Sequence, residues 1–241
     1  MANKILFVFE GEATEEKIVS SLQKFFVNES TTIKCVYGAE IYQIYKLIAA
    51  DNDLDTFNLI KERNLEKNAI LADYNRDDFA EIYMFFDYDG HSSLADDDKL
   101  KQLLEFFNEE TDKGKLYISY PMVESLKHIN SFETFRDLSI ECKYNINYKR
   151  IVADTALKEL INFNSYLIDT WKRLINVHLK KMNFVITDSY VLPDRLHSQQ
   201  RLFSEQLNKY ILPHSTVAIL SAFPIFLHDY YGNEELIKRL N

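Results

Sequence analysis

Residues 81–89 read EIYMFFDYD, and this stretch decides the fold class. Residues 82–86 are apolar without interruption. Such a run is too short for a helix and is typical of a strand that is buried on both faces of a parallel sheet. Asp87 and Asp89 follow directly. We therefore predict a strand over Glu81–Asp87 that ends in acidic side chains.

Further strands and helices are predicted on both sides of this stretch. The apolar run KILFVF and two β-branched or apolar segments predict strands over Lys4–Phe9, Thr31–Tyr37 and Lys115–Ser119. Helical spacing of apolar residues predicts helices over Ala13–Asn28 (with Thr14 as its N-cap), Glu40–Ala50, Asp55–Arg63 and Asp96–Glu110. Alternation of strands and helices predicts an α/β fold with a mostly parallel four-stranded sheet flanked by helices.

The last third of the chain shows a different pattern. Helical spacing dominates beyond residue 131, in segments near Thr155–Phe163, Tyr166–Lys181 and Ser198–Ile211. No linker rich in Pro, Gly or Ser separates the two parts. We therefore expect an α/β core over residues 1–131, and a mainly helical C-terminal extension over residues 132–241 that packs on this core.

Composition excludes several classes of protein. Apolar residues make up 46% of the 241 residues, which excludes wholesale disorder, and only 5 Gly and 4 Pro argue against Gly-rich phosphate loops. The longest apolar stretch, Val217–Leu227, is about half of the ~20 residues that a membrane span needs. Cys35 and Cys142 form no CxxC pair. Together with the lack of a signal peptide, this predicts a cytoplasmic protein with buried, reduced thiols and no membrane partner.

Charge is distributed unevenly along the chain. Residues 1–141 hold 15 Lys and Arg against 28 Asp and Glu, whereas residues 142–241 hold 13 against 9. Most of the surplus acids are expected on solvated helix faces. An acidic part beside a mildly basic part also fits a carboxylate cluster that recruits cations, with contacts to a polyanionic substrate elsewhere.

Acidic residues follow three of the predicted strands. Glu10 ends the first strand, Asp87 and Asp89 end the third, and the fourth leads toward Glu124. If the first and third strands are neighbours, Glu10, Asp87 and Asp89 converge at the carboxyl edge of the sheet, where ligands bind in such folds. Neighbouring carboxylates repel one another unless a cation joins them. Mg²⁺ or Mn²⁺ is the cation that suits such carboxylates best, and two such ions would support phosphodiester hydrolysis.

These motifs resemble those of TOPRIM-like nucleases. Residues 5–16, ILFVFEGEATEE, are similar to the TOPRIM strand that ends in Glu-Gly and leads into a Thr-Glu helix start, and residues 82–89, IYMFFDYD, are similar to its D-x-D strand. With the later Pro121-Met122-Val123-Glu124, the resemblance is strongest to phage-defence effectors of the RloB-like and PARIS AriB type. It covers roughly residues 4–130.

The resemblance implies a role for each matching residue. Glu10 would be a metal ligand or general acid/base, and Asp87 and Asp89 the metal-binding pair. Glu124 would be a further ligand or the partner of a ligand. Gly90 and His91 stand where some topoisomerase-type members have a third acid.

The resemblance also implies an activity and partners. The protein would be a Mg²⁺- or Mn²⁺-dependent endonuclease that cleaves RNA, tRNA in particular, or DNA. It would act as a toxic antiphage effector under a separate ABC- or OLD-type ATPase encoded nearby, which agrees with the lack of a P-loop in this sequence. The sequence does not decide the oligomeric state, and a homodimer is one of the states that fit it.

Two other functions stay open at this point. A TOPRIM-like scaffold would bind a partner ATPase or a nucleotide without cleaving. A HAD-like phosphotransferase would use Asp87 as nucleophile and Asp89 as acid/base, although that motif usually lies on the first strand and is followed by Thr or Val.

Other polar residues have a structural and a functional interpretation. Glu15 favours the positive end of a helix dipole or joins the metal site, and Asp96-Asp97-Asp98 is expected to cap a helix. His91 is an incidental loop residue or positions a phosphate. His128 is a surface residue or orients Glu124, which lies four residues before it.

The positive part of the chain holds basic pairs with aromatic residues nearby. These would hold a nucleic-acid backbone and stack on unpaired bases, or they are charged helix edges and core aromatics. They are Lys149-Arg150, Lys172-Arg173 and Lys180-Lys181, with Tyr144, Tyr148, Tyr166 and Trp171.

Overall fold

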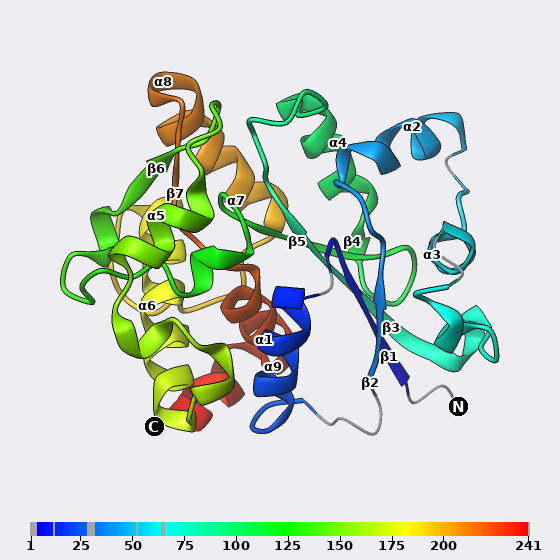
Figure 1. Ribbon diagram of the computed structural model, residues 1–241, viewed down its shortest axis with the longest axis horizontal. Coiled ribbons are helices and arrows are strands. Elements are labelled where there is room, and N and C mark those ends of the chain that lie inside the picture. Colours follow the sequence, from blue (N-terminus) through cyan, green and yellow to red (C-terminus); the bar gives the residue numbers. More distant parts are fainter. Residues whose placement is uncertain (1–3, 12, 28–31, 52, 64–65, 241) are drawn as a thin grey trace. The chain divides into compact units, whose positions relative to one another are not determined.

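The computed structural model of the chain (Figure 1) describes residues 4–11, 13–27, 32–51, 53–63 and 66–240. Glu12 of the Glu-Gly motif lies outside the described residues, as do residue 28 at the end of one predicted helix and residue 31 at the start of one predicted strand.

The described chain contains an α/β fold built on a mostly parallel five-stranded sheet in the order β2-β1-β3-β5-β4. Both β2 and β3 pair in parallel with β1, whereas β4 pairs antiparallel with β5. The strands are β1 (Lys4–Phe9), β2 (Thr32–Val36), β3 (Phe79–Asp87), β4 (Asn108–Glu109) and β5 (Gly114–Ser119). The four predicted strands are confirmed, but a sheet of four strands is wrong because β4 adds a fifth where the prediction continued a helix.

The central strand is β3, as its apolar sequence predicts. Seven of its nine residues are buried. The ring of Phe85 lies 5.4 Å from that of Phe7 on β1 and 5.7 Å from that of Tyr117 on β5. This row of aromatic rings crosses three neighbouring strands and forms part of the core.

Four helices accompany the sheet: α1 (Ala13–Gln23), α2 (Tyr42–Ala50), α3 (Thr56–Arg63) and α4 (Asp97–Phe106). The side chain of Asp96 accepts hydrogen bonds from the amides of Asp98 and Lys99, so the predicted capping role of this acidic run is confirmed. The prediction of Thr14 as the N-cap is wrong, because α1 begins at Ala13 and Thr14 lies inside the helix.

The C-terminal part is mainly helical, as predicted. Its elements are α5 (Tyr148–Thr155), α6 (Ile168–Thr187), α7 (Gln199–Gln206), α8 (Leu212–His214) and α9 (Ala222–Leu240), with a small sheet of β6 (Ser139–Glu141) and β7 (Thr216–Ala218). α6 packs against α7 and α9. The predicted helix over Thr155–Phe163 is wrong, because α5 ends at Thr155 and a short 3-10 turn over Lys158–Leu160 follows.

The chain divides into two compact units. The first comprises Met1–Asp87 and Leu94–Tyr117, and the second comprises Tyr88–Ser93 and Ile118–Asn241. The boundary expected from the sequence lies at residue 131. Among the described helices, none combines the length and the apolar character needed to cross a membrane.

Candidate metal centre

Pairing between β1 and β3 brings Glu10 next to Asp87. Phe9 lies opposite Phe85 in the parallel register, and the Glu10 amide continues the ladder by donating to the Phe85 carbonyl over 3.2 Å. One step further, the Asp87 amide donates to Oε2 of Glu10 over 3.1 Å. The side chain of Glu10 is therefore oriented by the backbone of the neighbouring strand.

Asp89 lies on the turn that follows β3. Its φ is 39°, in the left-handed region that Asp adopts more readily than most residues, and its amide donates to the Pro121 carbonyl over 3.2 Å. The next residue must be small, because a Cβ on Gly90 would lie 2.4 Å from Cε1 of Tyr88 and 2.9 Å from the Cys142 carbonyl oxygen. Close packing around Gly90 thus fixes the turn that carries Asp89.

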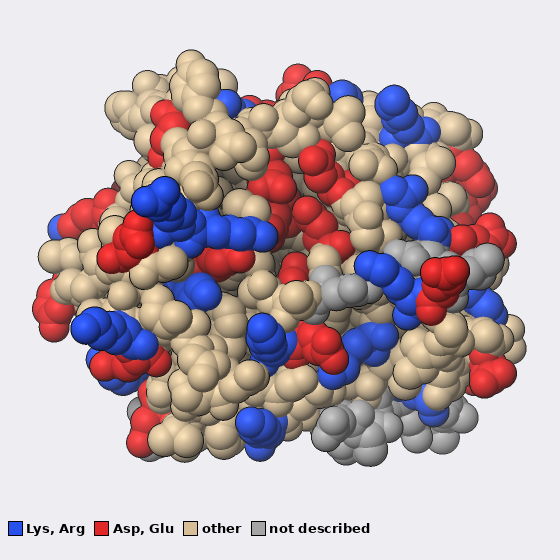
Figure 2. Space-filling model, in the orientation of Figure 1, with Lys and Arg blue, Asp and Glu red and all other residues tan. Residues whose placement is uncertain are grey.

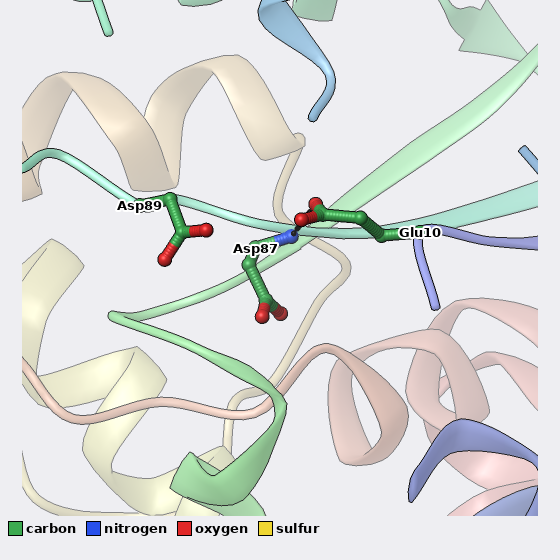
Figure 3. A group of neighbouring side chains, drawn as sticks. All are labelled: Glu10, Asp87 and Asp89. Carbon is green, nitrogen blue, oxygen red and sulfur yellow. Dashed lines mark hydrogen bonds between the residues drawn. The ribbon is translucent and has the colours of Figure 1, made fainter. Parts of the chain in front are cut away.

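The carboxylates of Glu10, Asp87 and Asp89 form one group (Figure 3), with a ligand atom of each within 4.8 Å of the other two. Asp87 is 7% exposed, and the side chain of Asp89 is 13% exposed. Two negative charges at this separation repel by about 3 kcal/mol at an effective dielectric constant of ~20. A divalent cation between them would convert this repulsion into attraction.

The donor set fits a hard divalent cation. All three groups offer carboxylate oxygen, the ligand that Mg²⁺ and Mn²⁺ prefer, and sites for Mg²⁺ commonly use one or two carboxylates with water completing the shell. The convergence of Glu10, Asp87 and Asp89, which was conditional on neighbouring strands, is therefore confirmed. The identity of the ion stays a prediction.

Glu124 is not part of this group. It lies in a 3-10 turn over Val123–Leu126, is 5% exposed, and places Oε1 at 3.7 Å from Nζ of Lys149. Its other oxygen, Oε2, is buried with no hydrogen-bond partner among the described residues. The ion pair with Lys149 was not predicted, because nothing in the local sequence links positions that are 25 residues apart. A catalytic role of Glu124 stays a prediction.

The two histidines near these acids differ in their environment. The side chain of His91 is 33% exposed, and its Nδ1 lies 4.0 Å from Oδ1 of Asp89. His128 is buried and lies within hydrogen-bond distance of the hydroxyls of Tyr148 and Thr155. The predicted surface position of His128 is therefore wrong. Burial lowers its pKa to about 4, and the charge of Lys181 adds to this effect.

Glu15 has a structural partner beside the centre. Its side chain is 7% exposed, and its Oε1 accepts a hydrogen bond from the Gly11 amide over 3.3 Å. Glu15 therefore stabilises the start of α1, as its structural role at the helix N-terminus predicts. It is not a member of the group formed by Glu10, Asp87 and Asp89.

Most of the proposed base-stacking residues belong to the core. Trp171, Tyr166 and Tyr148 are at most 5% exposed, whereas Tyr144 is 70% exposed. Lys181 is buried as well and donates to the carbonyls of Phe135 and Leu138. A nucleic-acid role for these four buried residues is excluded by their position.

The remaining basic residues form no continuous stripe on the visible face. Basic and acidic side chains are interspersed there (Figure 2). Independently of that view, Nη1 of Arg173 lies 3.0 Å from Oε1 of Glu159.

Both cysteines are buried free thiols, as predicted. Burial raises the pKa of Cys35 far above its usual range, so that this thiol is unreactive. Sγ of Cys142 lies 3.2 Å from the Ser215 carbonyl oxygen.

Comparison of the chain with protein-family models, with curated proteins and with solved structures gives no match. The geometry of the site and the sequence motifs around it therefore support the function proposed below.

Proposed function

We propose that the protein is a divalent-metal-dependent nuclease of TOPRIM-like type that cleaves phosphodiester bonds. The observation that carries this proposal is the group of three carboxylates at the carboxyl edge of a mostly parallel sheet. This edge is where open α/β sheets bind their ligands.

Each residue has a role in the proposed reaction. Asp87 and Asp89 would hold the cation from one strand end, and Glu10 would hold it from the neighbouring strand. Because the Asp87 amide binds Oε2 of Glu10, that carboxylate is already oriented before any ligand arrives. When bound, the divalent cation supplies positive charge that attracts the phosphodiester and stabilises the leaving oxygen. Glu10 would also accept a proton from the attacking water.

The biological setting is part of the same proposal. The motifs that resemble phage-defence effectors support an RNA substrate, with tRNA favoured over DNA, and control by a separate ATPase in the cytoplasm. In this proposal Glu124 acts indirectly on the site, through its ion pair with Lys149.

The proposal is tested by incubating the protein with Mn²⁺ and mixed RNA and DNA, with and without EDTA. Cleavage should require Mn²⁺ and should be lost in Glu10→Gln and in Asp87→Asn, which keep side-chain size but remove the charge. Glu105→Gln, an exposed position on α4, is the matched control and should cleave like the wild type. Cleavage that survives in Glu10→Gln and Asp87→Asn would overturn the proposal.

Two rival functions give different results in the same assay. A HAD-like phosphotransferase would act on a phosphomonoester, lose activity in Asp87→Asn and keep it in Glu10→Gln. Both side chains belong to the same group of carboxylates, which argues for a shared role of Glu10 and Asp87. A non-cleaving scaffold would stay inactive even when the neighbouring ATPase is added.

A further inference from the structure

A cavity of about 150 Å³ lies in the second unit, beside the turn that carries Asp89. Its walls are formed by the loop over residues 141–149 together with His91, Pro121 and Met122. One water needs about 10–15 Å³ of such a cavity, so there is room for a group much larger than a water or a single ion.

This cavity adjoins the candidate metal centre through two contacts within the same unit. Nδ1 of His91 lies 4.0 Å from Oδ1 of Asp89. The carbonyl of Pro121 accepts the hydrogen bond from the Asp89 amide over 3.2 Å. A molecule in the cavity would therefore lie next to the carboxylate that we assign to the cation.

The lining combines an exposed aromatic ring with amide groups. Tyr144 is 70% exposed and has neither a hydrogen bond nor a ring contact with another described residue. Asn145 and Asn147 follow it, and Oδ1 of Asn145 accepts the Asn147 amide over 3.0 Å, which holds the turn in place. Side-chain amides both donate and accept, so they suit the edges of nucleobases.

The cavity also has a positive side chain at its border. Lys149 lines it, and its side chain is 65% exposed although Nζ lies 3.7 Å from Glu124. Glu141 also lines the cavity, and its Oε1 accepts the amides of Cys142 and Lys143. A phosphate near Lys149 would gain a favourable charge contact.

We propose that this cavity binds an unpaired nucleotide of the substrate, with its base against Tyr144 and a phosphate near Lys149. This inference rests on the proposed function, since it names the substrate class of the same site. Bases in a continuous duplex are stacked and cannot reach an aromatic side chain in a cavity, whereas bases in loops and single strands can. The protein would therefore act on single-stranded segments of nucleic acid.

Binding is measured without cleavage, by fluorescence anisotropy of a short labelled RNA, a DNA of the same sequence and their duplexes, all in EDTA. Single strands should bind more tightly than duplexes, and the RNA and DNA arms show which sugar is preferred. Tyr144→Ala should weaken single-strand binding by about 5- to 100-fold, the range that a lost base stack gives. Tyr144→Phe should bind like the wild type, because it keeps the ring.

Leu212→Ala is the control, since Leu212 is 68% exposed on α8 in the same unit. Equal binding by Tyr144→Ala and the wild type, tighter binding of duplexes, or no binding of single strands would each overturn the inference. Cleavage with Mn²⁺ is scored separately. If Tyr144→Ala weakens binding but Glu10→Gln leaves cleavage unchanged, the nucleotide-binding role of the cavity is supported and the proposed function fails. If Tyr144→Ala binds like the wild type but Glu10→Gln abolishes cleavage, only the role of the cavity is overturned.

Discussion

The backbone amide of Asp87 donates a hydrogen bond to the carboxylate of Glu10 over 3.1 Å, which joins residues that are 77 positions apart. This contact follows from the parallel pairing of β1 with β3 and from the fact that both strands end at the same edge of the sheet. It places one carboxylate against the strand end that carries another, and Asp89 completes the group two residues later.

Replacing Gly90 should disturb this arrangement. In Gly90→Ala the new methyl group would lie within 3 Å of Tyr88 and of the Cys142 carbonyl, so the turn has to move. We expect a loss of about 1–3 kcal/mol in the free energy of unfolding, the usual cost of overpacking, together with weaker metal binding. Urea denaturation measures the loss, and Gly11→Ala, whose methyl group would meet only ordinary contacts, is the control. Equal stability of both variants would contradict the packing described for Gly90.

Asn68 should be important for the stability of the first unit. It is 2% exposed, and its side chain binds the amide and the carbonyl of Val36 on β2 and the carbonyl of Ile60 on α3. Asn68→Ala leaves these groups without the side-chain partner, so we expect a loss of about 2–4 kcal/mol in the free energy of unfolding. Thermal and urea denaturation test this. Asn58→Ala removes one exposed side-chain hydrogen bond, from Nδ2 of Asn58 to Oδ2 of Asp55, and should cost much less.

Stability should fall in mild acid. Burial lowers the pKa of His178 to about 3 and that of His128 to about 4, with a further contribution from the charge of Lys181. Below the ordinary value of 6.5 the unfolded chain binds protons on these histidines that the folded chain does not bind. The free energy of unfolding is therefore fully present above about pH 6.5 and declines as the pH falls toward 4, by up to ~1.4 kcal/mol per pH unit for each histidine.

Urea denaturation across this pH range measures the slope. His128→Gln should make it shallower by about one proton, whereas Asn58→Ala, which removes no ionisable group, should leave it unchanged. An identical slope in His128→Gln would show that His128 is protonated in the folded protein.

Much of the sheet could be predicted, because its strands have strong local signals. The apolar runs of β1 and β3 predict buried strands, because each run is too short for a helix. By contrast, β4 has only two residues, Asn108 and Glu109, which are both exposed and depend on pairing with β5. Such a strand has no sequence signal of its own. The helix predicted over Thr155–Phe163 failed because apolar spacing does not show where α5 ends.

The candidate site could be predicted in part. Glu10, Asp87 and Asp89 were found because strand ends in a parallel sheet share an edge. The burial of His128 and the ion pair between Glu124 and Lys149 depend on how distant segments fold together, so no local pattern indicates them. The cavity near Tyr144 was missed for the same reason.

Calorimetric titration of the protein with Mn²⁺ tests the central claim most directly. We predict saturable binding by the wild type and by Glu105→Gln, and a loss of affinity of about tenfold or more, ~1.4 kcal/mol, in Glu10→Gln, Asp87→Asn and Asp89→Asn. Wild-type affinity in these three folded variants, or no binding of Mn²⁺ by the wild type, would show that the three carboxylates do not form a metal site.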